Sequence, residues 1–78
     1  MTITETVPVL VDSTLLASVL YDVGELILQL EFCNGAIYRY FAVPAAIHDG
    51  LLIADSKGSY FNRKIRSGFR YVRIRRPR

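Results

Sequence analysis

The residues of this chain best suited to binding chemistry are the basic ones in its C-terminal third. Residues 56–78 hold nine of the ten Lys and Arg side chains and no acid, whereas all seven acids lie in residues 1–55. Such asymmetry predicts an anionic partner for this third, or internal pairing between the two halves. Arginine predominates, and its planar guanidinium group binds phosphate with two hydrogen bonds and stacks on bases. Solvated charge that protects an edge strand from aggregation is the alternative interpretation.

A pair of tyrosines is the second candidate. In Tyr38-Arg39-Tyr40 the two rings are two residues apart, so on a strand they share one face. Aromatic pairs on an open sheet face stack unpaired bases in several RNA-binding folds. A two-residue Asn34-Gly35 loop would place both rings on the polar face of the sheet. A three-residue loop, Cys33 to Gly35, would place them among the leucines, and we favour this core position while both registers stay open.

The segment Ser56-Lys57-Gly58-Ser59 is a candidate phosphate site, because it precedes a short basic helix. Backbone N–H groups at a helix N-terminus, a flexible glycine, a hydroxyl group and a lysine can together hold phosphate. The spacing is not that of a nucleotide-binding P-loop. A simple turn between helices, with Ser56 or Ser59 as the N-cap, is the alternative that we favour.

The sequence predicts no enzyme, cofactor or metal centre. Cys33 is the only cysteine and has no base near it in sequence, and His48, the only histidine, is expected at the surface or its boundary. One cysteine and one histidine do not make a metal-binding set, and no cofactor fingerprint occurs. A lone cysteine, the lack of a signal-peptide pattern and the lack of a long apolar stretch predict a cytoplasmic protein without a membrane span.

Hydrophobic patterning gives the elements that must position these residues. Leu26, Leu28, Leu30 and Phe32 alternate with Glu25, Ile27, Gln29 and Glu31, which is typical of a strand with one buried face. We expect strands at 13–21, 25–32, 36–43 and 69–74, and helices at 44–55 and 59–66. This order predicts an α+β fold of β-β-β-α-α-β type, a small antiparallel sheet with two short helices packed on one face.

Three finer expectations concern the ends of the chain and one glycine. Residues 1–12 are expected to form a flexible leader, residues 13–74 a single domain, and residues 75–78 an arginine-rich tail. On the last strand, Arg70 and Val72 should share one face, and Tyr71, Arg73 and Arg75 the other. Gly50, inside the first helix, predicts close approach to another backbone.

From Tyr21 to Tyr71 the sequence resembles the KTSC domain, a short bacterial and phage module that occurs alone and at the C-terminus of some lysyl-tRNA synthetases. The resemblance covers about two thirds of the chain. It rests on Tyr38 and Tyr40, Val43-Pro44, Ser56 to Gly58, Tyr60-Phe61-Asn62 and Ile65-Arg66. It carries no established activity, but its position beside tRNA synthetases implies RNA binding. Residues before Ser13 and after Ile74 lie outside the pattern.

Two functions are therefore carried forward. The first is a non-catalytic module that binds RNA or another polyanion through its basic surface. The residues predicted to contact nucleic acid are Tyr38, Arg39, Tyr40, Lys57, Tyr60, Arg63, Lys64, Arg66, Arg70 and Arg73. The second is an interaction or regulatory adaptor that docks an acidic protein partner or pairs through an exposed edge strand. The oligomeric state is left open.

Overall fold

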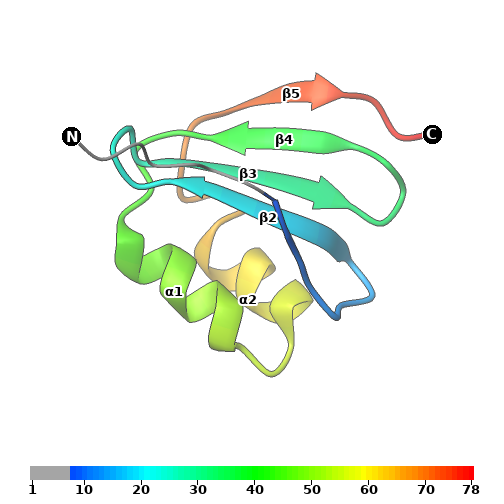
Figure 1. Ribbon diagram of the computed structural model, residues 1–78, viewed down its shortest axis with the longest axis horizontal. Helices are drawn as coiled ribbons and strands as arrows, with labels where there is room; N and C mark the ends of the chain where they lie inside the picture. Colours follow the sequence, from blue (N-terminus) through cyan, green and yellow to red (C-terminus); the bar gives the residue numbers. More distant parts are fainter. Residues whose placement is uncertain (1–7) are drawn as a thin grey trace.

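A five-stranded antiparallel sheet runs through the computed structural model, which describes residues 8–78. The strands are β1 (Val9–Leu10), β2 (Leu16–Asp22), β3 (Ile27–Phe32), β4 (Ile37–Tyr40) and β5 (Tyr71–Arg75), and they lie in this order across the sheet. Helices α1 (Ala45–Ile53) and α2 (Lys57–Lys64) connect β4 to β5 and lie on the same side of the sheet (Figure 1). The predicted α+β fold is confirmed.

β1 is a strand that the sequence did not predict. Its two residues lie within the segment expected to form a leader, and they pair with Val19 and Ser18 of β2. A two-residue strand has too few positions to show an alternating pattern, which explains why it was missed. Residues 1–7 of the expected leader lie outside the described residues.

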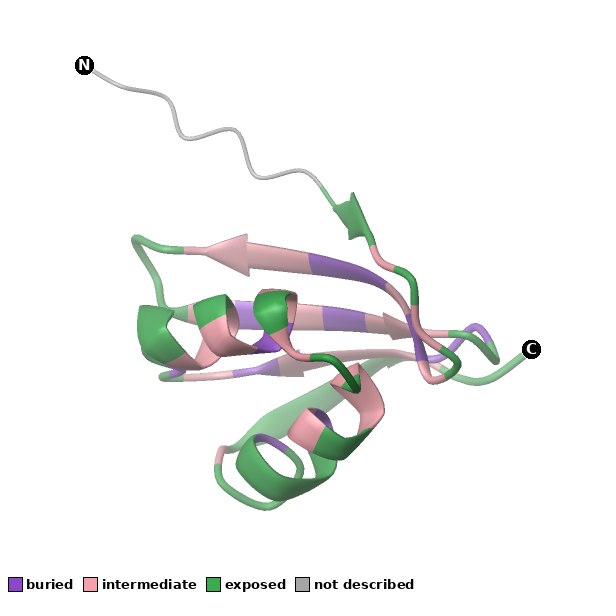
Figure 2. Cartoon of the chain, turned by 90° about the horizontal axis from the view of Figure 1, so that it is seen from below, coloured by how far each residue is buried: buried purple, intermediate pink, exposed green. Residues whose placement is uncertain are grey.

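The core lies between the helices and the sheet face that they cover. Leu28 and Leu30 are fully buried, as their alternation predicted, and buried positions recur along the central strands in Figure 2. Leu51 of α1 and Phe61 of α2 pack against them, together with Ile65 just after α2. Burial of this apolar surface is the main force that holds the helices on the sheet.

Leu26 departs from the predicted alternation. It is 40% exposed with a φ of 56°, and β3 begins only at the next residue. The reason is the turn before it, where Asp22 Oδ1 accepts hydrogen bonds from the N–H groups of Gly24 and Glu25 at 3.0 and 3.1 Å. This turn occupies the residues that the alternating pattern assigned to the strand.

The β3–β4 hairpin has the three-residue loop. Of the two registers that the sequence left open, the structure therefore has the one that places the tyrosines among the leucines. Phe32 N–H donates to the carbonyl of Ala36, and Gly35 N–H donates to the carbonyl of Phe32, both at 2.8 Å. Gly35 has a φ of 94°, a conformation that glycine adopts without a steric penalty. In this register Tyr38 pairs with Leu30, and both tyrosines face the helices.

One tyrosine side chain links the two helices directly. Tyr60 on α2 donates its hydroxyl hydrogen to the carbonyl of Ile47 on α1 at 2.9 Å, and its ring lies over Gly50. The close approach predicted at Gly50 is real, but the partner is this side chain and not a backbone. No helix in the described part of the chain is long and apolar enough to cross a membrane.

A β-bulge in β5 overturns one predicted orientation. Arg73 pairs with Tyr38 and Arg75 pairs with Ile37, so Ile74 is an extra residue between them. The extra residue shifts the alternation by one position, and Arg75 therefore lies on the face opposite to Arg73 instead of sharing it.

Candidate nucleic-acid interface

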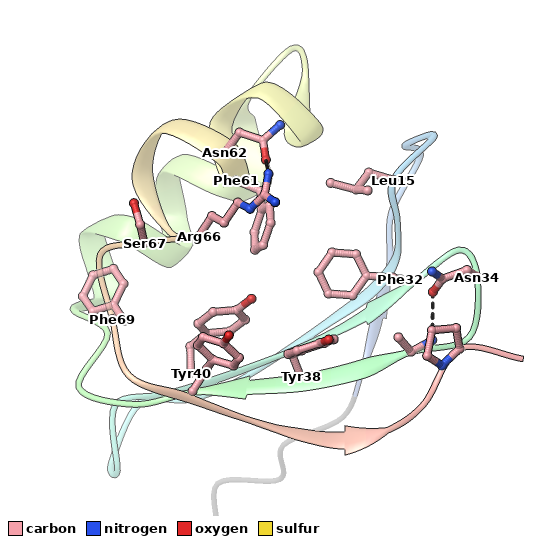
Figure 3. A pocket seen from close by; sticks show the side chains of 13 residues that line it. Leu15, Phe32, Asn34, Tyr38, Tyr40, Phe61, Asn62, Arg66, Ser67 and Phe69 are labelled. Atoms are coloured by element: carbon pink, nitrogen blue, oxygen red, sulfur yellow. Dashed lines mark hydrogen bonds between the residues drawn. The ribbon is translucent and has the colours of Figure 1, made fainter.

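A groove of about 810 Å³ opens between α2 and the strands β4 and β5. Figure 3 shows Tyr38 and Tyr40 on its sheet side, with Phe61 and Arg66 across from them. Phe32 and Leu15 lie toward one end, and Phe69 lies toward the other. The remaining lining residues are Asn34, Ala36, Asn62, Ser67, Tyr71 and Pro77. We call this feature the aromatic groove.

Three tyrosine rings form the sheet side of the aromatic groove. The ring centroid of Tyr71 lies 5.6 Å from that of Tyr38 and 5.5 Å from that of Tyr40. Tyr40 is 3% exposed, whereas Tyr71 is 54% exposed and Tyr38 is intermediate. The predicted core position of the tyrosines is therefore correct for Tyr40, while Tyr38 and Tyr71 extend the same array to the surface.

Phenylalanines support this array from the core side. Phe32 meets Tyr38 edge to face at 5.7 Å, and Phe61 meets Tyr40 edge to face at 5.9 Å. Edge-to-face pairs of this kind stabilise ring positions beyond the burial of their area. Tyr38 and Tyr40 are thus held in place without any ligand.

The Tyr40 hydroxyl is neutral over the whole physiological range. The pKa of Tyr40 is raised to about 12, chiefly by burial and to a smaller extent by the neighbouring Tyr38 and Tyr71, while the Arg66 guanidinium opposes the rise. Within residues 8–78 the hydroxyl makes no hydrogen bond, and it is not sealed from solvent. It is available as a hydrogen-bond donor inside the aromatic groove.

Four of the predicted site residues meet at the aromatic groove. Tyr38, Tyr40 and Arg66 line it, and Arg73 pairs with Tyr38 on the adjoining strand. Arg66 is exposed, and its Nη1 lies 3.4 Å from Oδ1 of Asn62. The sequence missed Tyr71 as a partner of the other two rings, because only the pairing of β4 with β5 brings it beside them.

Three other predicted residues make contacts elsewhere. Arg39 donates to Oε1 of Gln29 at 3.1 and 2.8 Å on the sheet face away from the helices. Tyr60 is bound between the helices, and Lys57 Nζ donates to the carbonyl of Ala54 at 3.1 Å. None of these three lines the aromatic groove.

The remaining predicted bases are solvent-exposed. Arg63 and Lys64 lie in the last turn of α2, and Arg70 lies just before β5. Arg66 lines the aromatic groove and Arg73 pairs with Tyr38 beside it, whereas Arg63, Lys64 and Arg70 do not line it. We call Arg63, Lys64, Arg66, Arg70 and Arg73 the basic surface.

The predicted phosphate segment acts as a helix cap. Ser56 Oγ accepts a hydrogen bond from the N–H of Ser59 at 3.2 Å, which is the N-cap arrangement that we favoured. A hollow of about 240 Å³ adjoins Ser56, Lys57 and Gly58, and Asp12 and Asp55 also line it. Two carboxylates beside this segment oppose the approach of a phosphate.

Internal pairing uses very little of the basic charge. Among residues 8–78, Arg75 is the only base of the C-terminal third that forms an ion pair with a carboxylate, Nη2 to Glu31 Oε2 at 3.1 Å. The five members of the basic surface have no such partner in the described part of the chain. Internal pairing therefore accounts for one base of the C-terminal third within residues 8–78.

The single cysteine and histidine form no site. Cys33 is exposed, with Sγ 3.6 Å from the carbonyl oxygen of Ser13. His48 stacks on Tyr21 with ring centroids 4.5 Å apart. Over residues 8–78, no three His, Cys, Asp or Glu side chains gather in a group that could hold a metal ion.

Comparison with known proteins gives a consistent set of similarities. The family model of the KTSC domain matches residues 12–69. An uncharacterized protein of Stutzerimonas stutzeri is 45% identical over 67 residues, which cover 85% of this chain and 94% of that protein. A lysine–tRNA ligase of Nostoc sp. is 45% identical over 47 residues, which cover 60% of this chain and 8% of the ligase. The crystal structure of a KTSC domain protein from Yersinia pestis has a TM-score of 0.85 at 29% identity, over 91% of this chain and 100% of that chain.

Proposed function

Because this chain belongs to the KTSC domain family, as its sequence resemblance predicted, we propose that it is a small non-catalytic module that binds RNA through the basic surface. The observation that carries the proposal is the lack of carboxylate partners for Arg63, Lys64, Arg66, Arg70 and Arg73 within residues 8–78. Five exposed bases, of which Arg66 and Arg73 adjoin the aromatic groove, suit a polyanion that also carries flat rings.

The relatives support RNA as the polyanion. A related segment occurs in a protein named as a lysine–tRNA ligase, where it makes up 8% of the length. A small module attached to a protein named for acting on tRNA is well placed to hold RNA near it. No cofactor is part of the proposal, and the cytoplasm is the compartment in which such a module would meet RNA.

Fluorescence polarization with a labelled single-stranded RNA of mixed sequence tests the proposal. Binding should weaken steeply with salt, because each phosphate contact lowers log K by about 0.7 for each unit of log salt concentration. A dissociation constant above roughly 100 μM at low salt would contradict RNA binding, since this is weaker than ordinary non-specific affinity.

A pair of variants separates the basic surface from net charge. Arg66→Gln and Arg73→Gln together should weaken binding and reduce the salt slope by about 1.4, the contribution of two phosphate contacts. Arg75→Gln is the matched control, because Arg75 is bound to Glu31 and lies on the other face. If only total charge mattered, Arg75→Gln would lower log K by half as much as the double variant does, because it removes one charge instead of two.

A second function is favoured by one observation. β5 is an edge strand with exposed Tyr71, Val72 and Ile74, and its neighbours are basic, so an acidic strand of a partner protein could pair with it. Purification from a lysate treated with nuclease distinguishes the two functions. An acidic protein partner should remain bound after the treatment, whereas molecules bridged by nucleic acid should be lost.

A further inference from the structure

We infer that the aromatic groove holds an unpaired base of the bound RNA, so that the module selects single strands over duplexes. This inference rests on the proposed RNA binding and adds a site and a substrate class to it. Its structural basis is the juxtaposition of an open, preformed set of tyrosine rings with bases on the two elements that border the groove.

Three tyrosine rings in the aromatic groove form a surface on which a base can stack. Tyr71 offers a half-exposed ring, and Tyr38 and Tyr40 continue it into the groove with centroid separations below 6 Å from Tyr71. Stacking of one base on an aromatic side chain is worth about 1 to 3 kcal/mol and tolerates any base. Because Phe32 and Phe61 already hold the rings of Tyr38 and Tyr40, little ordering of these two is needed when a base enters the groove.

The size and shape of the aromatic groove suit an unpaired base. The volume of about 810 Å³ lies within the range of small-molecule pockets, which is about 300 to 1,000 Å³. α2 stands on one side of the groove and the sheet on the other, so a ligand must enter between them (Figure 3). A base that is paired and stacked in an A-form helix cannot present its ring face there, whereas an unpaired base can be splayed out.

Charged and polar side chains at the aromatic groove match the groups that surround a stacked base. Arg66 borders the groove on the helix side and Arg73 on the strand side, where phosphates before and after a stacked base would run. Inside the groove, the free Tyr40 hydroxyl and the Ser67 side chain can meet polar groups of the base or the ribose. These contacts suit a nucleotide better than a proline-rich peptide, which also docks in aromatic grooves but carries no phosphate for the arginines.

Comparing single-stranded and duplex RNA of the same sequence tests the inference. The single strand should bind at least about tenfold more tightly, and its binding should quench tyrosine fluorescence, which is readable because the chain has five tyrosines and no tryptophan. Tyr71→Leu, which keeps an apolar side chain but removes the ring, should weaken single-strand binding about 5- to 160-fold and leave duplex binding within about twofold.

Tyr71→Phe is the matched control, since it keeps the ring and should retain wild-type affinity. Tyr71 is more than half exposed, so both variants should fold, and far-ultraviolet circular dichroism checks this. RNA binding that is equal for single strand and duplex, or unchanged in Tyr71→Leu, would overturn the groove while leaving the basic surface intact. Absence of any RNA binding would overturn both proposals. Binding of a proline-rich peptide that depends on Tyr71, without RNA binding, would reassign the groove.

Discussion

Arg75 on β5 reaches across β4 to Glu31 on β3, with 3.1 Å between Nη2 and Oε2. The second oxygen of Glu31 accepts from Ser18 Oγ at 3.0 Å, and Arg75 Nε donates to the carbonyl of Gly35 at 2.8 Å. This network ties three strands and the β3–β4 loop together on the face that the helices leave open. It removes Arg75 from the set of bases available to an anion.

The Arg75–Glu31 pair should contribute modestly to stability. A double-mutant cycle with Arg75→Gln and Glu31→Gln should give a coupling energy of about 0.5 to 1 kcal/mol, because both side chains are partly exposed. Urea unfolding at low and high salt measures it, and the coupling should shrink at high salt. A coupling of zero at low salt would mean that the pair does not hold the sheet.

Gly50→Ala should lower the free energy of unfolding by about 1 to 2 kcal/mol, although alanine favours helices by about 1 kcal/mol. An added Cβ would meet the Tyr60 hydroxyl, which is fixed by its bond to Ile47. Gly58→Ala is the control, since a Cβ there would lie at an ordinary 3.6 Å from the Leu15 side chain. Thermal or urea unfolding measures both; equal effects in the two variants would contradict the steric explanation.

Stability should fall between pH 10 and pH 12 because of Tyr40. Its pKa is raised from 10.0 to about 12 in the folded protein, so the neutral form stabilises the fold fully below pH 10 and this contribution is lost as the pH rises toward 12. Urea unfolding across this range, with absorbance of the tyrosinate ion followed in parallel, measures it. Tyr40→Phe should show a shallower loss, and identical slopes would refute the assignment.

Ser56→Ala should destabilise the protein by about 1 kcal/mol through loss of the helix cap, while leaving RNA affinity unchanged. Ser59→Ala is the matched control, because Ser59 contributes its backbone N–H and not its hydroxyl to this cap. Unfolding and polarization titrations of the two variants measure the separate effects. A selective loss of RNA affinity in Ser56→Ala would instead support the phosphate site predicted there.

Local rules predicted most of the fold. Alternating leucines located β3, the Asn34-Gly35 pair located a hairpin, and Pro44 marked the start of α1. These features depend on neighbours in sequence, which is why the pattern is informative. The hairpin register was harder, because loops of two or three residues fit the same glycine and differ only in which hydrogen bonds form.

The candidate site was predicted only in part. Tyr38, Tyr40, Arg66 and Arg73 have residue types that suit RNA, and all four lie at or beside the aromatic groove. Type alone did not separate them from Arg39 or Lys57, whose charges are engaged by Gln29 and by a carbonyl. The groove and the place of Tyr71 in it depend on contacts between distant parts of the chain, which the sequence pattern does not encode locally.

The extra residue at Ile74 also determines which neighbours each arginine of β5 has. On a regular strand, alternate residues lie on opposite faces, so Arg73 and Arg75 would share one face. Because Ile74 is an extra residue in β5, Arg73 lies beside the tyrosines and Arg75 lies on the opposite face, where it pairs with Glu31. Deletion of Ile74 should remove the bulge but leave Arg73 opposite Tyr38 and Arg75 opposite Ile37, so the Arg75–Glu31 pair should survive it. The spacing of Arg73 and Arg75 along the chain therefore does not give their faces, because the bulge between them changes the alternation.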